Sequence, residues 1–123
     1  MEPSTTSTTK ISRPMVIMVT HVGEDHTPLV RAYAWLIPRR ARLAATYPRQ
    51  HVAIVETRFI AITPNYGVSG HRARQFDRNT PVGMVQLGEP EEALAQYRLF
   101  NGTIEVRHRI NRRLICTYDV PRE

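Results

Sequence analysis

Cysteine is almost absent from this chain, since Cys116 is the only one in 123 residues. A single thiol cannot form an internal disulfide, and it is too few for a cysteine zinc cluster. The chain is therefore unlike a disulfide-stapled secreted domain. We expect Cys116 to serve as a small buried hydrophobic residue on a strand.

Lysine is equally scarce, because Lys10 is the only one among seventeen basic residues and the rest are arginine. Against eleven acidic residues, the balance is a formal charge of +6 and a pI near 10.2. Such a charge favours an anionic partner, either nucleic acid or an acidic protein surface. Arginine suits phosphate through its planar fork. The alternative explanation of the arginine bias is the base composition of the gene.

Long hydrophobic runs are also missing. No stretch approaches the roughly 20 apolar residues that a membrane-spanning helix needs, and the N-terminus lacks a signal-peptide pattern. We expect no membrane span and a cytoplasmic or virion location. Residues 1–12 are rich in Ser and Thr and predict a flexible arm, followed by one β-rich domain over residues 13–123, a size that encloses one core.

The C-terminal stretch has the clearest strand pattern. Apolar and polar residues alternate on both sides of Asn111, with the period of two that half-buried strands show. We predict a hairpin whose three-residue connection, 111–113, pairs Val106 with Tyr118 and Ile104 with Val120. This pairing places the apolar sets on one face, whereas a slip of one residue would separate them.

The other elements are predicted from residue type and from the proline and glycine residues that mark their ends. Residues 90–101 predict the clearest helix, opened by Pro90 and stopped by Gly102. Residues 38–48 are ambiguous and favour a short helix, with a strand as the alternative, and 64–81 predict a long connection. Runs rich in β-branched and aromatic residues predict the remaining strands: 15–22, central and covered on both faces; 29–37, antiparallel to it; 52–62, either one long strand or two with a bulge or tight turn; and 82–87. The fold class is therefore α+β, with a mainly antiparallel sheet of five to seven strands, one clear helix and the C-terminal hairpin, and curling toward a barrel stays an alternative.

Catalytic patterns are weak. The segment from His21 to His26 holds two imidazoles and two carboxylates, but this spacing matches no known metal site and is typical of a solvated turn. Gly67 to His71 departs from a nucleophile elbow, because His71 replaces its second glycine. With no phosphate loop or dinucleotide motif either, we predict a protein that is not an enzyme and has no catalytic residue, metal or cofactor.

Arginine clusters are the stronger pattern. Interleaved with aromatic residues, they can hold phosphates while bases stack, so we predict a small module that binds RNA or single-stranded DNA. The alternative is a structural or adaptor protein, such as a viral or phage capsid-associated component that forms homo-oligomers, in which each cluster is an independent solvated edge. The predicted nucleic-acid-binding residues are Arg39, Arg40, Arg42, Tyr66, Arg72, Arg74, Phe76, Arg78, Arg107, Arg109, Arg112 and Arg113.

Overall fold

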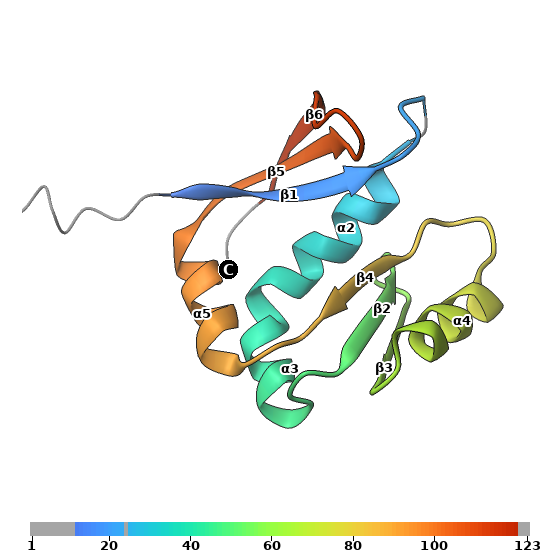
Figure 1. Cartoon of the computed structure of the whole chain (residues 1–123), viewed down its shortest axis with the longest axis vertical. Helices are drawn as coiled ribbons and strands as arrows, with labels where there is room; N and C mark the ends of the chain where they lie inside the picture. Colours follow the sequence, from blue (N-terminus) through green and yellow to red (C-terminus); the bar gives the residue numbers. More distant parts are fainter. Residues whose placement is uncertain (1–11, 24, 121–123) are drawn as a thin grey trace, which may run out of the picture.

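Two three-stranded sheets form the frame of the protein in the computed structural model, which describes residues 12–23 and 25–120 (Figure 1). The predicted arm lies outside the described residues except for Ser12. The first sheet has the order β1-β5-β6, where β1 pairs parallel with β5 and β5 pairs antiparallel with β6. The second has the order β3-β2-β4 with antiparallel pairs throughout. The strands are β1 (Arg13–Val19), β2 (His51–Val55), β3 (Phe59–Thr63), β4 (Gly83–Gln86), β5 (Phe100–His108) and β6 (Leu114–Asp119).

Helices separate and cover these sheets. One core joins α2 to the first sheet through Val30, Ile17 and Ile104, and another joins α2 to the second sheet through Leu36 and Val52. On the far face of the second sheet, α4 adds a third core, so the layers run sheet, helix, sheet, helix (Figure 1). The fold is α+β, and the sheets do not close into a barrel. The helical elements are α2 (Thr27–Leu36), the 3-10 turn η1 (Ile37–Arg39), α3 (Arg40–Thr46), α4 (Tyr66–Phe76) and α5 (Pro90–Leu99).

The central helix α2 replaces the strand predicted over residues 29–37, so that prediction was wrong. The helix lies between two sheets, and its Val30, Tyr33 and Trp35 are residue types that strands favour, so the prediction mistook this run for a strand. Pro28 at the first turn and the Asp25 side chain, which accepts from the Thr27 N–H at 3.0 Å, mark its start. Gly83 allows α2 to lie directly on β4, since a Cβ there would be 3.3 Å from the Ala32 Cβ.

Strand β1 lies at an edge of its sheet, whereas the sequence predicted a central strand covered on both faces. Ile17 points into the core and is buried, while Val16 on the other face is 44% exposed. The strand also pairs parallel with β5, because the whole chain between them serves as the crossover. The continuous apolar run misled the prediction, since its Val16 and Met18 have no layer above them within the described residues.

Helix α4 occupies most of the segment that was predicted as a long connection. Asn65 caps it, accepting from the Val68 N–H at 3.0 Å. Ser69, Gly70 and Ala73 form its buried face, and their small side chains let the helix lie close to the second sheet. Because glycine and serine are poor helix formers, the prediction mistook this packing face for a loop.

Several predictions are confirmed. Residues 38–48 contain the short helix α3, residues 52–62 divide into β2 and β3 around a tight turn in which Glu56 has φ of 51°, and β4 and α5 lie where expected. Gly102 does not stop α5, however. The helix ends at Leu99, and Gly102 lies inside β5 with φ of +88°.

The C-terminal hairpin is present, but its connection is longer than predicted. Ile104 pairs with Tyr118 and Val106 with Cys116, two residues away from the predicted register, so the apolar sets still share a face. The connection spans residues 109–113, and a bulge at Arg107 turns Leu114 outward. Cys116 lies on β6 and packs against the core of the first sheet as expected, but it is half-buried and not buried.

Candidate nucleic-acid interface

The tip of the β5–β6 hairpin carries three exposed arginines, Arg109, Arg112 and Arg113, which we call the tip arginines. Their backbone is held firmly. Arg109 N–H donates to the Val19 carbonyl at 2.8 Å, and Arg112 N–H donates to the His108 carbonyl at 2.9 Å. Within the described chain, none of the three guanidinium groups forms an ion pair. The tip therefore presents unneutralised positive charge on an ordered loop.

Arg107 has a different role from the tip arginines. Its Nε donates to Glu105 at 2.8 Å, and its Nη1 donates to the Arg112 carbonyl at 2.8 Å. Through these two bonds the Arg107 side chain stabilises the turn, and Arg107 therefore positions the tip.

A second group of exposed arginines lies on and just after α4. Arg72 and Arg74 belong to the helix and Arg78 follows it; we call these the α4 arginines. Ion pairs from them to described carboxylates are absent. The neighbouring Arg58 already forms an ion pair, since its Nη2 lies 2.7 Å from the Asp77 carboxylate.

The two predicted aromatic residues are only partly available. Tyr66 is 60% exposed and meets the His51 ring edge-on at 5.8 Å. Phe76 stacks on Phe59 with ring centroids 4.8 Å apart, and the Arg58 guanidinium lies 5.4 Å from the Phe76 ring centroid. Phe76 thus packs on the second sheet, and Tyr66 has the more open ring.

The third predicted cluster is largely built into the fold. Arg40 donates to the Gln86 carbonyl at 2.7 Å, to the Leu87 carbonyl at 3.3 Å and to the Gln96 side chain at 2.9 Å. Burial lowers the pKa of the Arg40 guanidinium, but the group stays charged at any physiological pH. Arg39 bonds the Trp35 carbonyl at 2.8 Å and lies over its ring, whereas Arg42 is exposed.

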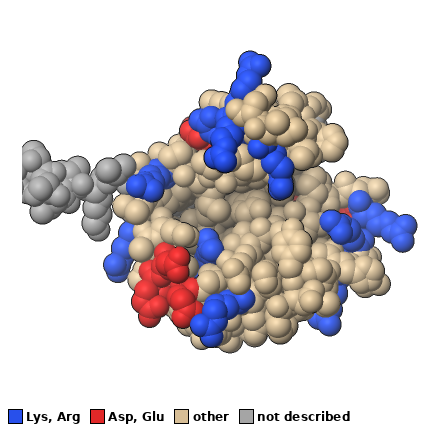
Figure 2. All heavy atoms as spheres, viewed as in Figure 1, with Lys and Arg blue, Asp and Glu red and all other residues tan. Residues whose placement is uncertain are grey.

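The hairpin tip and the segment that follows α4 meet at one cavity. A cavity of about 180 Å³ is lined by Arg109 from the tip and by Pro81 and Val82, a few residues after Arg78. Figure 2 shows basic side chains over the hairpin and at the α4 side, with a hollow between the upper and lower parts of the molecule. In contrast, α3 lies at the opposite end of the long axis from the hairpin (Figure 1).

The segment from His21 to His26 forms no metal centre in the described chain, where no three His, Cys, Asp or Glu side chains gather in a suitable group. Glu24 lies outside the described residues. Asp25 precedes the first turn of α2 and accepts from the Thr27 N–H, which holds the pKa of this carboxyl below its usual value. His26 is buried at the start of that helix, and its Nε2 has no hydrogen-bond partner within the described part of the chain.

Ser69, in the sequence that resembles a nucleophile elbow, is a structural residue. Its hydroxyl lies 2.7 Å from the Thr63 hydroxyl and donates to the His51 carbonyl at 2.8 Å. Since Ser69 is fully buried on α4, it ties this helix to β2 and β3.

Comparison with protein-family models, curated proteins and solved structures finds no match to this chain. Among the described residues, no helix is both long and apolar enough to cross a membrane. What sequence reasoning missed is the hollow between β1 and β4, because no local pattern shows that these two strand edges lie on either side of α2.

Proposed function

We propose that the protein binds single-stranded nucleic acid, RNA or DNA, through the tip arginines and the α4 arginines. The supporting observation is that Arg109 lines one cavity together with Pro81 and Val82, which follow the α4 arginines in the chain, and that its described lining residues include no carboxylate. All six arginines are exposed. Unneutralised arginines release counterions when they meet phosphate, which drives binding.

A single strand suits this surface better than a duplex. Exposed guanidinium planes stack on unpaired bases as well as holding phosphates. The tip also carries Ile110, which is 83% exposed and offers an apolar contact to bases that a duplex would keep stacked. Arg39, Arg40 and Arg107 are left outside the proposed interface, because their donors serve the fold.

Fluorescence anisotropy with labelled single-stranded RNA and DNA over a salt series tests the proposal. The variant is Arg112→Gln with Arg113→Gln. Losing two phosphate contacts should flatten the slope of log K against log salt by about 1.4, since each contact contributes about 0.7 on a single strand. The matched control is Arg42→Gln with Arg98→Gln, two exposed arginines away from the site that remove the same charge.

The comparison of the two double variants decides the outcome. If both weaken binding equally, the attraction is diffuse and the proposed interface is wrong. Absence of binding by the unaltered protein at low salt would refute nucleic-acid binding altogether.

An assembly or adaptor role is a second proposal, favoured by exposed aliphatic side chains near the tip. Val22 and Leu114 line a cavity of about 280 Å³ beside Arg113, and Ile110 projects nearby. Ultracentrifugation of the full chain over a concentration range should then show self-association that Ile110→Ser weakens. A monomer at every concentration would remove the self-assembly version of this proposal.

A further inference from the structure

The edges of β1 and β4 border the same hollow, with α2 as its floor (Figures 1 and 2). Met18 and Val19 of β1 line the 180 Å³ cavity together with Val82, which precedes β4, and Leu29 of α2. Each strand is at the edge of its sheet, so each has backbone groups that point away from its partner strand. The two edges differ in how these groups are satisfied.

The β4 edge is already covered by side chains. The Tyr33 hydroxyl donates to the Met84 carbonyl at 3.1 Å and accepts from the Met84 N–H at 3.3 Å. Arg40 donates to the Gln86 carbonyl at 2.7 Å. These contacts block pairing of another strand with β4.

The β1 edge is open. Val19 directs its carbonyl toward the β5 side, where Arg109 N–H donates to it at 2.8 Å. Backbone groups along a strand alternate between its two sides, so those of Val16 and Met18 point away from β5. The described residues supply no hydrogen-bond partner for these outward groups. An extended chain could therefore pair with β1 as a fourth strand.

A second cavity lies beside the first half of β1. Its volume is about 210 Å³, and Met15, Leu36, Ile37, Leu99 and Phe100 form most of its apolar wall. Small-molecule sites are larger, roughly 300–1,000 Å³. The cavity therefore fits one or two side chains of a bound segment better than a complete small ligand.

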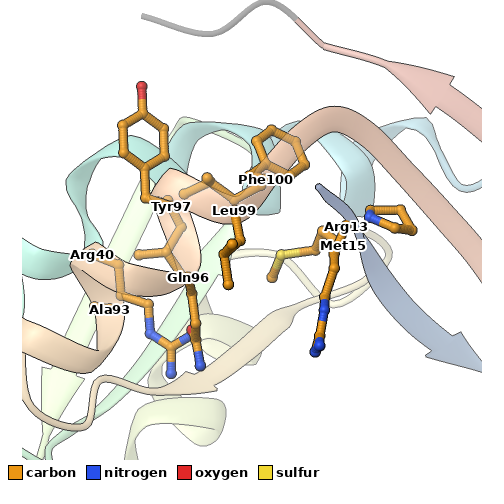
Figure 3. A pocket seen from close by; sticks show the side chains of 11 residues that line it. Arg13, Met15, Arg40, Ala93, Gln96, Tyr97, Leu99 and Phe100 are labelled. Carbon is orange, nitrogen blue, oxygen red and sulfur yellow. The ribbon is translucent and has the colours of Figure 1, made fainter. Parts of the chain in front are cut away.

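Two arginines line this cavity, and Arg40 already bonds protein acceptors, which leaves Arg13 for a partner. Figure 3 shows Arg13 and Arg40 on opposite sides, with Met15 and Leu99 between them. Acidic residues are absent from the described lining of both cavities. At this site, the formal charge of +6 favours an acidic partner over a second copy of this chain.

From the open edge, the apolar cavity and Arg13 beside it, we infer that β1 binds an extended acidic segment of a partner protein by strand addition. Main-chain hydrogen bonds to Val16 and Met18 hold the segment in register. One aliphatic side chain enters the 210 Å³ cavity, and a neighbouring carboxylate meets Arg13. This site adjoins Arg109 at the 180 Å³ cavity, but the proposed contacts to Val16, Met18 and Arg13 use no side chain of the tip arginines.

A fluorescein-labelled peptide, Asp-Val-Glu-Leu-Glu-Val-Asp, is the probe, and anisotropy measures its binding to the full chain. Val16→Pro removes one outward N–H while leaving the β5 side intact, because proline is tolerated on the free side of edge strands. We expect at least tenfold weaker binding for Val16→Pro and less than threefold for the matched control Val16→Ala. Equal urea midpoints for the two variants show that the fold is retained.

Arg13→Glu is the second variant, which tests charge without altering the backbone. It should lower the affinity for the acidic peptide at least fivefold. The affinity for a version of the peptide with Asn and Gln in place of Asp and Glu should fall less. The variant Arg112→Gln with Arg113→Gln should bind the peptide normally, which separates this site from the nucleic-acid proposal.

Three results would overturn the inference. One is that the peptide shows no saturable binding at about 1 mM, the weak end of specific affinities. Another is equal affinity of Val16→Pro and Val16→Ala. The third is that Val16→Pro abolishes a homodimer or oligonucleotide binding while leaving peptide affinity unchanged, which would assign the edge to a different occupant.

Discussion

Tyr33→Phe tests whether the central helix holds the edge of the second sheet. The substitution removes a single oxygen that bonds both the carbonyl and the N–H of Met84, at 3.1 and 3.3 Å. Both bonds are long and partly buried, so each contributes toward the lower end of the usual 0.5–1.5 kcal/mol. We expect the free energy of unfolding to fall by about 1–2 kcal/mol.

Urea unfolding followed by circular dichroism measures this loss. With an m-value of roughly 1–3 kcal/mol/M, the midpoint should fall by about 0.3–2 M. The matched control is Tyr66→Phe, whose hydroxyl is exposed and makes no hydrogen bond within the described residues. It should change stability by less than about 0.5 kcal/mol.

The pH dependence of the free energy of unfolding gives an independent check on the role of the Tyr33 hydroxyl. Burial raises the pKa of the Tyr33 hydroxyl above its ordinary value of 10.0. A group with a raised folded pKa stabilises the protein fully below its unfolded pKa and loses that contribution as pH rises through the folded pKa. The stability difference between the unaltered protein and Tyr33→Phe should therefore shrink above about pH 10. An unchanged midpoint at pH 7, or a gap that stays constant to pH 11, would refute this account of the β4 edge.

Two further predictions concern stability. Leu36→Ala should lower the free energy of unfolding by about 2–5 kcal/mol in urea titration, because Leu36 is 1% exposed and packs between α2 and the second sheet; a loss below about 1 kcal/mol would contradict this packing. Asp77→Asn should lower the thermal midpoint at pH 7, since bonds from Arg58 and Thr80 hold the pKa of this carboxyl well below its usual range. That stabilisation is present above about pH 4 and is lost as pH falls further, so thermal midpoints of the two proteins should converge in acid.

Local sequence patterns were sufficient to predict an element where it has one buried side and clear end signals. Helix α5 has Pro90 at its start and acidic residues in its first turn, and the hairpin alternates with period two. Even in the hairpin, the predicted connection was too short by two residues, because the bulge at Arg107 leaves no signal in the local sequence. The shared apolar face survived the error, since a slip of two preserves side-chain orientation.

The errors have physical causes in packing. Helix α2 is covered on both sides and contains residue types that strands favour, so its sequence resembles a strand, and α4 packs through Ser69, Gly70 and Ala73, so its sequence resembles a loop. The arginine clusters were visible in the sequence, but their state of pairing was not. Arg40 and Arg107 bond groups that are distant or on the other side of a turn, whereas the tip arginines remain exposed.

The sequence by itself determined the charge, the scarcity of cysteine, the absence of long apolar runs, and those elements whose burial is one-sided. Tertiary structure decided that α2 lies between two sheets, because only contacts between distant segments can bury both sides of one helix. It also decided that the β4 edge is covered by Tyr33 and Arg40 while the β1 edge is open. Which backbone groups keep a free hydrogen-bonding side depends on neighbours far along the chain, and no local pattern records them.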